Sequence, residues 1–327
     1  MPDPFRWGIL GCGNISKKFA TGLQSLDNAT LAAVGSRSQE NADRFADEFP
    51  ADRRHASYEA LAADPDVDAI YVATPHPFHL ENSVLCLRNK KSVLCEKPFT
   101  INRAQAEELV AVSLDEKVFL MEAMWSRFLP LLVRVRELIA DGAIGEVRML
   151  QADFGFRANV NPDGRLFNLD LGGGGLLDVG VYTVSLASMI LGTPDDILST
   201  AEIGETGVDE QAAIIFKYDS GQMALLAAGV RTRTPHEATI LGTDGYIRLH
   251  SSWWNGSKGT LVRGNDSEPL ETPTVGNGYN YEAEEVARCV AEGLIESPAM
   301  PHDESITIMG TLDTIRAQWG LKYPMES

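Results

Sequence analysis

The sequence predicts a two-domain α/β protein, with a doubly wound parallel sheet first and an α+β domain with a large, mostly antiparallel open sheet second. Three observations carry this prediction. Apolar runs alternate with helix-like segments over the first 125 residues, a glycine-rich turn follows the first run, and turn-linked strand patterns dominate residues 197 to 250. The chain has 327 residues, 44% of them hydrophobic, enough for two cores.

The first domain, 1–125, contains nearly continuous apolar runs, which are typical of parallel strands buried on both faces. Strands are expected at 6–13, 30–38, 68–75, 91–98 and 117–125. Helices of amphipathic spacing are expected between them at 15–26, 39–49, 78–90 and 102–116. This regular alternation indicates helices on both faces of a parallel sheet.

The second domain, 126–327, changes character after its first helix, which is expected at 129–142. A strand at 144–156 and a helix within 172–192 follow. Further strands are expected at 197–203, 210–218, 222–230, 237–242 and 246–250. Short turn signals between these strands favour an antiparallel sheet. Helices near 282–293 and 303–319 close the chain, and the last is a candidate to pack back on the first domain.

Composition excludes some partners. With 28 Lys+Arg against 46 Asp+Glu, the formal charge of −18 repels phosphate backbones and anionic lipid, so we expect no nucleic-acid or membrane partner. The four cysteines form no CxxC pair and are expected as free thiols in a reducing compartment. The beginning of the sequence lacks a leader pattern, and no apolar run approaches the roughly 20 residues that span a bilayer. We therefore expect a cytoplasmic protein.

The first expected strand ends in the pattern G-x-G-x-x-S, which opens a helix. Gly11 permits the tight turn, and Gly13 lets the backbone N–H groups of the turn approach a pyrophosphate at the positive end of the helix. Asn14 and Ile15 complete the candidate nucleotide-binding turn. The alternative is a glycine turn without a ligand, but the strand–turn–helix context favours a dinucleotide-binding Rossmann domain.

The second expected strand ends in Ser36 and Arg37, without the carboxylate that accepts the ribose 2′-hydroxyl of NAD. A hydroxyl beside a guanidinium suits a 2′-phosphate instead. We therefore predict NADP as the cofactor, with NAD as the second choice. The alternative is that Arg37 is a solvated residue at a helix start.

Polar residues follow the third expected strand, where ligands bind in open α/β sheets. These are Thr74, Pro75, His76 and His79. The two histidines could also be metal ligands or core residues. No third ligand stands out, so we predict no metal and place them at a pocket.

The next strand ends in Glu96, Lys97 and Pro98. A lysine at the mouth of a cofactor crevice could lower the pKa of an alcohol or tyrosine, or transfer a proton itself. Pro98 would fix the loop, and Glu96 could orient the lysine or touch the cofactor. The alternative is an ordinary surface lysine after a strand.

Asp178 and Tyr182 are four residues apart in an otherwise apolar segment, so they share a face of the expected helix. The carboxylate is costly there unless it has a partner. A nearby cation would depress the unperturbed tyrosine pKa of about 10, so Tyr182, helped by Lys97, could exchange a proton with a substrate. The alternative is a capping aspartate and a core tyrosine.

Together these segments resemble the Gfo/Idh/MocA oxidoreductase family over essentially the whole chain. The matching stretches are "GILGCGNIS", "VATPHPFH", "CEKP", "EAMWSRFLP", "RLFNLDLGGGGLLDVGVY" and "IRAQWGLKYP". The tyrosine at 182, where many members carry histidine, points to the subgroup of dimeric dihydrodiol dehydrogenases and NADP-dependent D-xylose dehydrogenases. One departure is Leu169, where relatives often have proline, which leaves the path of that loop open.

The resemblance implies that Lys97 and Tyr182 are the catalytic pair and that Asp178 supports them. It implies a substrate pocket shaped by His76, His79, Trp125, Phe154, Tyr182 and Trp254. It also implies that Arg165 approaches the nicotinamide. The residues at the two strand ends, Thr74, Pro75, His79, Glu96 and Lys97, are predicted to join the cofactor site.

The implied activity is hydride transfer between NADP and a carbinol carbon of a sugar, cyclic polyol or trans-dihydrodiol. Two alternatives remain: a sugar-ketone reductase of the anhydrofructose type, and a non-catalytic nicotinamide-binding sensor. The family commonly pairs the open sheet of its second domain with a partner subunit, which implies a homodimer.

Overall fold

The computed structural model describes residues 4–326, and the chain divides into two compact units. The first unit comprises the chain up to Trp125 together with Val275–Ile306, and the second comprises Ser126–Thr274 and the chain from Thr307 onward. The outermost ends of the expected domains, residues 1–3 and 327, lie outside the described residues.

The first unit is built on a parallel sheet with the strand order β3-β2-β1-β4-β5-β6 within the described residues. Its strands are β1 (Phe5–Leu10), β2 (Ala29–Gly35), β3 (Arg53–His55), β4 (Ala69–Val72), β5 (Ser92–Glu96) and β6 (Leu120–Ala123). The chain order reverses between β1 and β4, which is the switch point where doubly wound sheets bind their ligands. The predicted doubly wound parallel sheet is confirmed.

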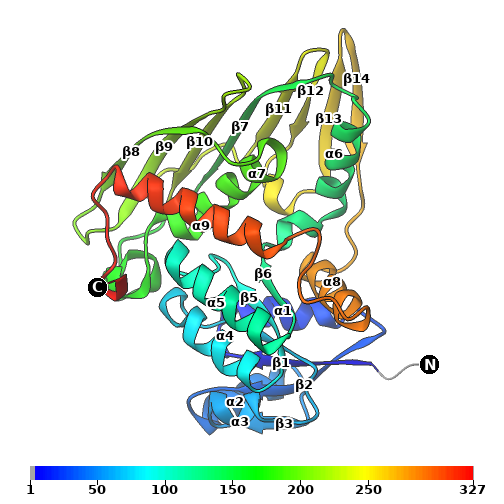
Figure 1. Ribbon diagram of the computed structural model, residues 1–327, viewed down its shortest axis with the longest axis vertical. Helices are drawn as coiled ribbons and strands as arrows, with labels where there is room; N and C mark the ends of the chain where they lie inside the picture. The colour runs from blue at the N-terminus through cyan, green and yellow to red at the C-terminus, as the bar shows by residue number, and fades with distance from the viewer. Residues whose placement is uncertain (1–3, 327) are drawn as a thin grey trace. The chain divides into compact units, whose positions relative to one another are not determined.

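Helices pack in pairs around this sheet. They are α1 (Asn14–Leu23), α2 (Gln39–Glu48), α3 (Tyr58–Ala62), α4 (His79–Arg88), α5 (Arg103–Glu116) and α8 (Tyr279–Ala291). Helix α4 lies against α5, and α1 lies against α8 (Figure 1). The approach of α1 to α8 is so close that a Cβ on Gly22 would lie 3.0 Å from the backbone nitrogen of Asn280. A segment far along the chain therefore completes the layer beside α1.

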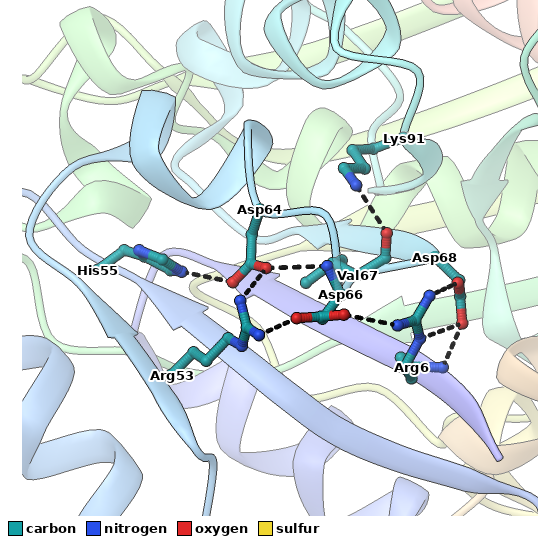
Figure 2. Close-up of polar contacts among 8 residues, drawn as sticks. All are labelled: Arg6, Arg53, His55, Asp64, Asp66, Val67, Asp68 and Lys91. Atoms are coloured by element: carbon teal, nitrogen blue, oxygen red, sulfur yellow. Dashed lines mark hydrogen bonds and ion pairs between the residues drawn. The ribbon is translucent and has the colours of Figure 1, made fainter. Parts of the chain in front are cut away.

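An ion-pair network fastens the loop that leads into β4 (Figure 2). Arg6 from β1 contacts Asp66 at 3.2 Å and Asp68 at 2.7 Å. Arg53 from β3 contacts Asp64 at 2.7 Å and also bonds to Asp66. The Asp68 carboxyl is partly desolvated, which raises its pKa, but the bonds from Arg6 outweigh this and its pKa lies below its usual range. The network ties β1 and β3 to this loop.

We expect Asp64→Ala to lower the free energy of unfolding by about 2 kcal/mol, since a buried acceptor of charge-assisted bonds is lost. The Asp64 side chain is only 1% exposed and also contacts His55 at 2.8 Å. Urea unfolding followed by circular dichroism measures the change. Asp47→Ala removes an exposed ion pair and is the matched control, with an expected change below about 1 kcal/mol. Equal effects of the two substitutions would contradict the assignment.

The second unit contains an open sheet with the order β14-β13-β12-β11-β7-β10-β9-β8 within the described residues (Figure 1). Its strands are β7 (Val147–Gly155), β8 (Asp196–Ile203), β9 (Asp209–Lys217), β10 (Met223–Gly229), β11 (Ala238–Gly242), β12 (Gly245–Leu249), β13 (Lys258–Arg263) and β14 (Asp266–Glu271). Strands β7 and β10 pair in parallel, and the other neighbours are antiparallel. The predicted large, mostly antiparallel open sheet is confirmed.

One face of this sheet is covered and the other is open. Helix α7 (Val181–Leu191) packs on β7 and β10. Burial alternates along β9, where Ile214 and Phe216 are buried and Ile215 is exposed. The cross-strand register places Leu198, Ile215 and Leu225 in one row on the open face. Apolar side chains in a row on an exposed face commonly mark an interaction surface.

The remaining helices of the second unit are α6 (Pro130–Ala140), a π-helix η5 (Leu176–Gly180) that leads directly into α7, and the later part of α9 (His302–Ala317), which begins in the first unit. The stretch Leu169–Leu191 is apolar and long enough to cross a membrane by length and composition, although the sequence analysis found no such run. Of its most apolar window, 78% is buried, as in the core helix of a folded domain.

Candidate active site

The glycine turn lies between β1 and α1, at the switch point of the first sheet. Gly11 has φ +97°, and a Cβ there would lie 3.1 Å from the carbonyl oxygen of Ala73, so only glycine fits. A Cβ on Gly13 would meet no described atom within 4 Å. The protein itself does not require glycine at position 13, which suits a backbone that a ligand approaches closely.

Helix α1 begins at Asn14, followed by Ile15. Among the described residues, no side chain caps its first N–H groups. The Ser16 hydroxyl donates back to Gly11 O, so it holds the turn without covering the helix end. Uncapped N–H groups at the positive end of a ten-residue helix form an anion site. The turn therefore fits the pyrophosphate of a dinucleotide.

The end of β2 carries Ser36 and Arg37. Ser36 is buried and its N–H donates to His55 O at 3.1 Å, whereas Arg37 is exposed and lies within electrostatic reach of Tyr58. Partial burial raises the pKa of Tyr58, and Arg37 opposes this rise. Tyr58 also interacts with Cys12 of the glycine turn, so this tyrosine lies near both predicted parts of the nucleotide site. Tyr58 was not singled out from the sequence, because it begins a short helix of five residues that carries no recognisable motif.

His79 links the tips of β4 and β5. It is fully buried, with Nε2 2.9 Å from Thr74 O and Nδ1 2.9 Å from Pro98 O. The two carbonyls favour the charged ring, but burial outweighs them and lowers the pKa of His79 to about 4. His79 is therefore neutral at neutral pH and fastens the two loops together, which suits a positioning role.

The neighbouring residues of this loop are less uniformly buried. His76 is buried with its ring centroid 5.8 Å from that of His79, and Pro75 is half-buried. Within residues 4–326, no group of three or more His, Cys, Asp or Glu side chains is arranged to hold a metal ion.

Glu96 is the buried centre of the loop that carries Lys97. The Tyr71 hydroxyl donates to Glu96 Oε1, and the Lys97 N–H donates to Glu96 Oε2 at 3.1 Å. The Lys97 side chain is half-buried, and the Lys97–Pro98 peptide bond is cis. Glu96 thus binds the backbone N–H of Lys97, the first of the two roles expected for it.

A second acid behind this loop, Glu282 from α8, was missed by the sequence analysis. Glu282 is fully buried, and among the described residues neither carboxyl oxygen has a hydrogen-bond partner. Burial, and then the charge of Glu96, raises the pKa of Glu282 well above its usual range. No sequence signal could have found it, because 185 residues separate the two acids along the chain.

In the second unit, Asp178 has the partner that its apolar surroundings require. Arg165 Nη2 donates to Asp178 Oδ1 at 2.9 Å. Asp178 lies in the π-helix η5 and Tyr182 in the first turn of α7, where the sequence analysis expected a regular α-helix throughout. Single π-turns within helices occur often at functional sites. Leu169 starts a 3₁₀ turn, Leu169–Leu171, just before the glycine run, which settles the path of that loop.

Tyr182 belongs to an aromatic cluster within the second unit. Phe154 lies 5.4 Å from Tyr182 by ring centroids and stacks on Trp254. His236, which the sequence analysis missed, lies 4.8 Å from the Trp254 ring and 5.5 Å from Phe154. Its backbone is left-handed, with φ +65°, and its N–H donates to Asp153 Oδ1 at 2.6 Å. Three predicted substrate residues thus lie together beside a histidine.

The remaining predicted substrate residue, Trp125, lies in the first unit and stacks on Tyr279 with ring centroids 4.5 Å apart. The predicted residues therefore form two groups. The first unit holds the glycine turn, the β2 end, the two strand tips and Trp125, and the second unit holds Arg165, Asp178, Tyr182, Phe154 and Trp254.

Comparison with known families matches both units. Residues 5–123 match a model described as an oxidoreductase family with an NAD-binding Rossmann fold, and residues 132–248 match the GFO/IDH/MocA C-terminal domain. The first match contains the uncapped glycine turn, and the second contains Asp178 and Tyr182.

Similar proteins extend over almost the whole chain. Trans-1,2-dihydrobenzene-1,2-diol dehydrogenase of Xenopus laevis is 38% identical over 98% of this chain and 99% of its own, and that of Mus musculus is 37% identical over 98% of each. A solved 3-ketoreductase from Actinomadura kijaniata, in complex with NADP and TDP-benzene, has a TM-score of 0.86 and is 27% identical, covering 96% of this chain and 98% of that one.

Proposed function

Because this chain belongs to the GFO/IDH/MocA oxidoreductase family, we propose that it is an NADP-dependent dehydrogenase acting on a carbinol group of a sugar, a cyclic polyol or a trans-dihydrodiol. The observation that carries the proposal is its near-full-length similarity to trans-dihydrobenzenediol dehydrogenases. The aromatic cluster of Phe154, Trp254 and Tyr182 supports it, since flat apolar side chains beside a phenol suit a ring-shaped alcohol.

In the proposed mechanism, a bound nicotinamide would supply the hydride acceptor for the carbinol carbon. Tyr182 in its phenolate form would take the hydroxyl proton, and the Lys97 ammonium would stabilise the negative charge that develops on the substrate oxygen. The ion pair between Asp178 and Arg165 ties the π-helix to the turn that carries Arg165. We propose that the first unit binds the nucleotide and that the second supplies most of the substrate contacts.

The proposal is tested by following nicotinamide absorbance with NADP⁺ or NAD⁺ and a panel of pentoses, hexoses, cyclic polyols and trans-dihydrodiols. We expect oxidation of at least one pentose or dihydrodiol with NADP⁺. Turnover of sugar ketones with NADPH alone would favour a reductase of the anhydrofructose type. Binding of NADP⁺ without turnover of any compound in either direction would favour a sensor and overturn the dehydrogenase proposal.

NADP is the proposed cofactor because Ser36 and Arg37 follow β2 where a 2′-phosphate would lie. We expect Arg37→Ala to raise the Kd for NADP⁺ by about 10- to 100-fold, the loss of one charge-assisted contact, and to leave the Kd for NAD⁺ unchanged. Quenching of protein fluorescence by each nucleotide measures both constants. Arg88→Ala, an exposed arginine at the end of α4, is the control. Equal weakening of both nucleotides would contradict the role of Arg37.

A homodimer is proposed through the open face of the second sheet. The row of Leu198, Ile215 and Leu225 supports it, since a second copy of the same face would cover these exposed side chains. All four cysteines are free, which fits a reducing compartment, and the proposed location is the cytoplasm.

A further inference from the structure

A buried carboxyl group packs against the glycine run 172–175, which precedes the helix that carries Asp178 and Tyr182. Asp209, the first residue of β9, is fully buried, and the N–H of Leu176 donates to its Oδ2 at 2.6 Å. Leu176 is the first residue of the π-helix that contains Asp178. A carboxylate at this point accepts an otherwise unpaired helix N–H and faces the positive end of the helix.

The glycine run is what permits this contact. Gly174 has φ +113°, and a Cβ on it would lie 2.2 Å from Asp209 Oδ1, a distance at which real atoms cannot coexist. A Cβ on Gly173 would lie 2.8 Å from the carbonyl oxygens of Arg165, Leu166 and Asn168. The run therefore serves close packing of the helix start on Asp209 and on the turn that carries Arg165.

Two further contacts fasten the same turn. The Tyr323 hydroxyl donates to Gly173 O at 2.9 Å. Val179 of the π-helix and Val208, the residue before Asp209, share one buried apolar cluster. Three contacts therefore hold the start of the helix: the Tyr323 hydrogen bond, the apolar cluster and Asp209 on the sheet. Of these, Asp209 supplies the hydrogen bond to the helix N–H itself.

Asp209 is not held as an ordinary ionised carboxylate. Burial raises its pKa to about 7, the charge of Asp178 adds to the rise, and the N–H groups of Leu176 and Gly175 oppose it. Ionised and neutral forms therefore coexist at neutral pH, and the other oxygen, Oδ1, has no hydrogen-bond partner among the described residues. Asparagine has the shape and charge of the neutral form, which makes it the conservative substitution.

We propose that Asp209 is a positioning residue that fixes the first turn of the Asp178–Tyr182 helix, and thereby the place of the Tyr182 hydroxyl in the reaction. The inference rests on the proposed function for its kinetic consequence only. Asp209 acts through the helix backbone and touches neither substrate nor cofactor in this role. Loss of the Leu176 bond lets the π-turn shift, and a shift of about 1 Å at a reacting group costs about 10²-fold in rate.

The experiment compares Asp209→Ala and Asp209→Asn with Asp266→Asn, an exposed aspartate of the same sheet, as control. We expect kcat to fall about 10²-fold for the alanine variant, with KM and the Kd for NADP⁺ nearly unchanged, and most of this loss to be restored in the asparagine variant. An alanine variant that keeps wild-type kcat, or an asparagine variant as impaired as the alanine one while equally well folded, would overturn the positioning role.

Hydrogen exchange measured by mass spectrometry gives a readout that needs no turnover. We expect faster exchange in peptides covering 172–186 of Asp209→Ala and unchanged exchange in the rest of the second unit. Uniformly faster exchange, or no change in that segment, would overturn the inference. If the wild-type protein oxidises nothing in the substrate panel while exchange still changes locally, the dehydrogenase proposal fails and the anchoring by Asp209 stands.

Discussion

Tyr182→Phe is expected to lower kcat by about 10²- to 10⁴-fold, the usual contribution of a positioned acid or base, while the Kd for NADP⁺ stays at the wild-type value. The ring of phenylalanine keeps the contact with Phe154, where the Tyr182 centroid lies 5.4 Å away, so the aromatic cluster remains filled. Only the hydroxyl that we propose exchanges the proton is lost. Steady-state absorbance kinetics and nucleotide titration measure the two quantities.

Tyr246→Phe removes a hydroxyl from an exposed tyrosine on β12 and is the matched control, expected to retain wild-type kcat. A primary kinetic isotope effect with a deuterated carbinol carbon adds a second criterion. If removal of the substrate hydroxyl proton becomes limiting once the Tyr182 hydroxyl is gone, the isotope effect on kcat changes. An active Tyr182→Phe enzyme with an unchanged isotope effect would remove Tyr182 from the mechanism.

The local sequence pattern was enough to predict the fold of the first unit, because most strands are followed directly in the sequence by the helix that packs on the sheet. The runs at 68–75 and 91–98 correspond to β4 and β5, and their apolar character follows from burial on both faces of a parallel sheet. Strand β3 was missed because "RRH" is polar and short. Its Arg53 forms an ion pair with Asp64 of the loop before β4, a tertiary contact that no local pattern reveals.

Elements joined across long stretches of chain were harder to predict. Nothing local shows that Val275–Ile306 groups with the first unit, since an amphipathic helix such as α8 can pack on either domain. The hairpin of β13 and β14 was missed because its residues are largely exposed and charged. The parallel pairing of β7 with β10 likewise requires a crossover that the strand pattern does not reveal.

The residues of the candidate site were also predictable only where they lie close together in the chain. Residues adjacent in the chain, such as Gly11 with Gly13 or Glu96 with Lys97, could be singled out because the chemistry of a turn or strand end is local. Glu282, Asp209 and His236 could not be found, since each acts on a segment remote in sequence. For Asp209 there was one usable signal. Four glycines before an apolar helix demand a close neighbour, although the sequence does not say which one.

Lys97→Met is expected to lower kcat by about 10²- to 10³-fold, the range for losing one preorganised charge at a reacting oxygen. Methionine keeps much of the aliphatic stem of the half-buried lysine. The backbone bond from the residue 97 N–H to Glu96 is also kept, so the loop retains its shape. Lys90→Met, an exposed lysine paired with Glu116, is the control and should leave kcat at its wild-type value.

Lys97→Arg separates the two possible duties of the lysine. Arginine keeps the positive charge but does not release a proton near neutral pH. Partial recovery of kcat relative to Lys97→Met therefore indicates an electrostatic role for the lysine. No recovery indicates that the lysine transfers a proton. Combining Lys97→Met with Tyr182→Phe then tests cooperation between the two units. When two residues act as a unit, the double substitution lowers kcat by far less than the product of the two single-substitution factors. Fully multiplicative losses would show that Lys97 and Tyr182 act on independent steps, and the proposed catalytic pair would fall.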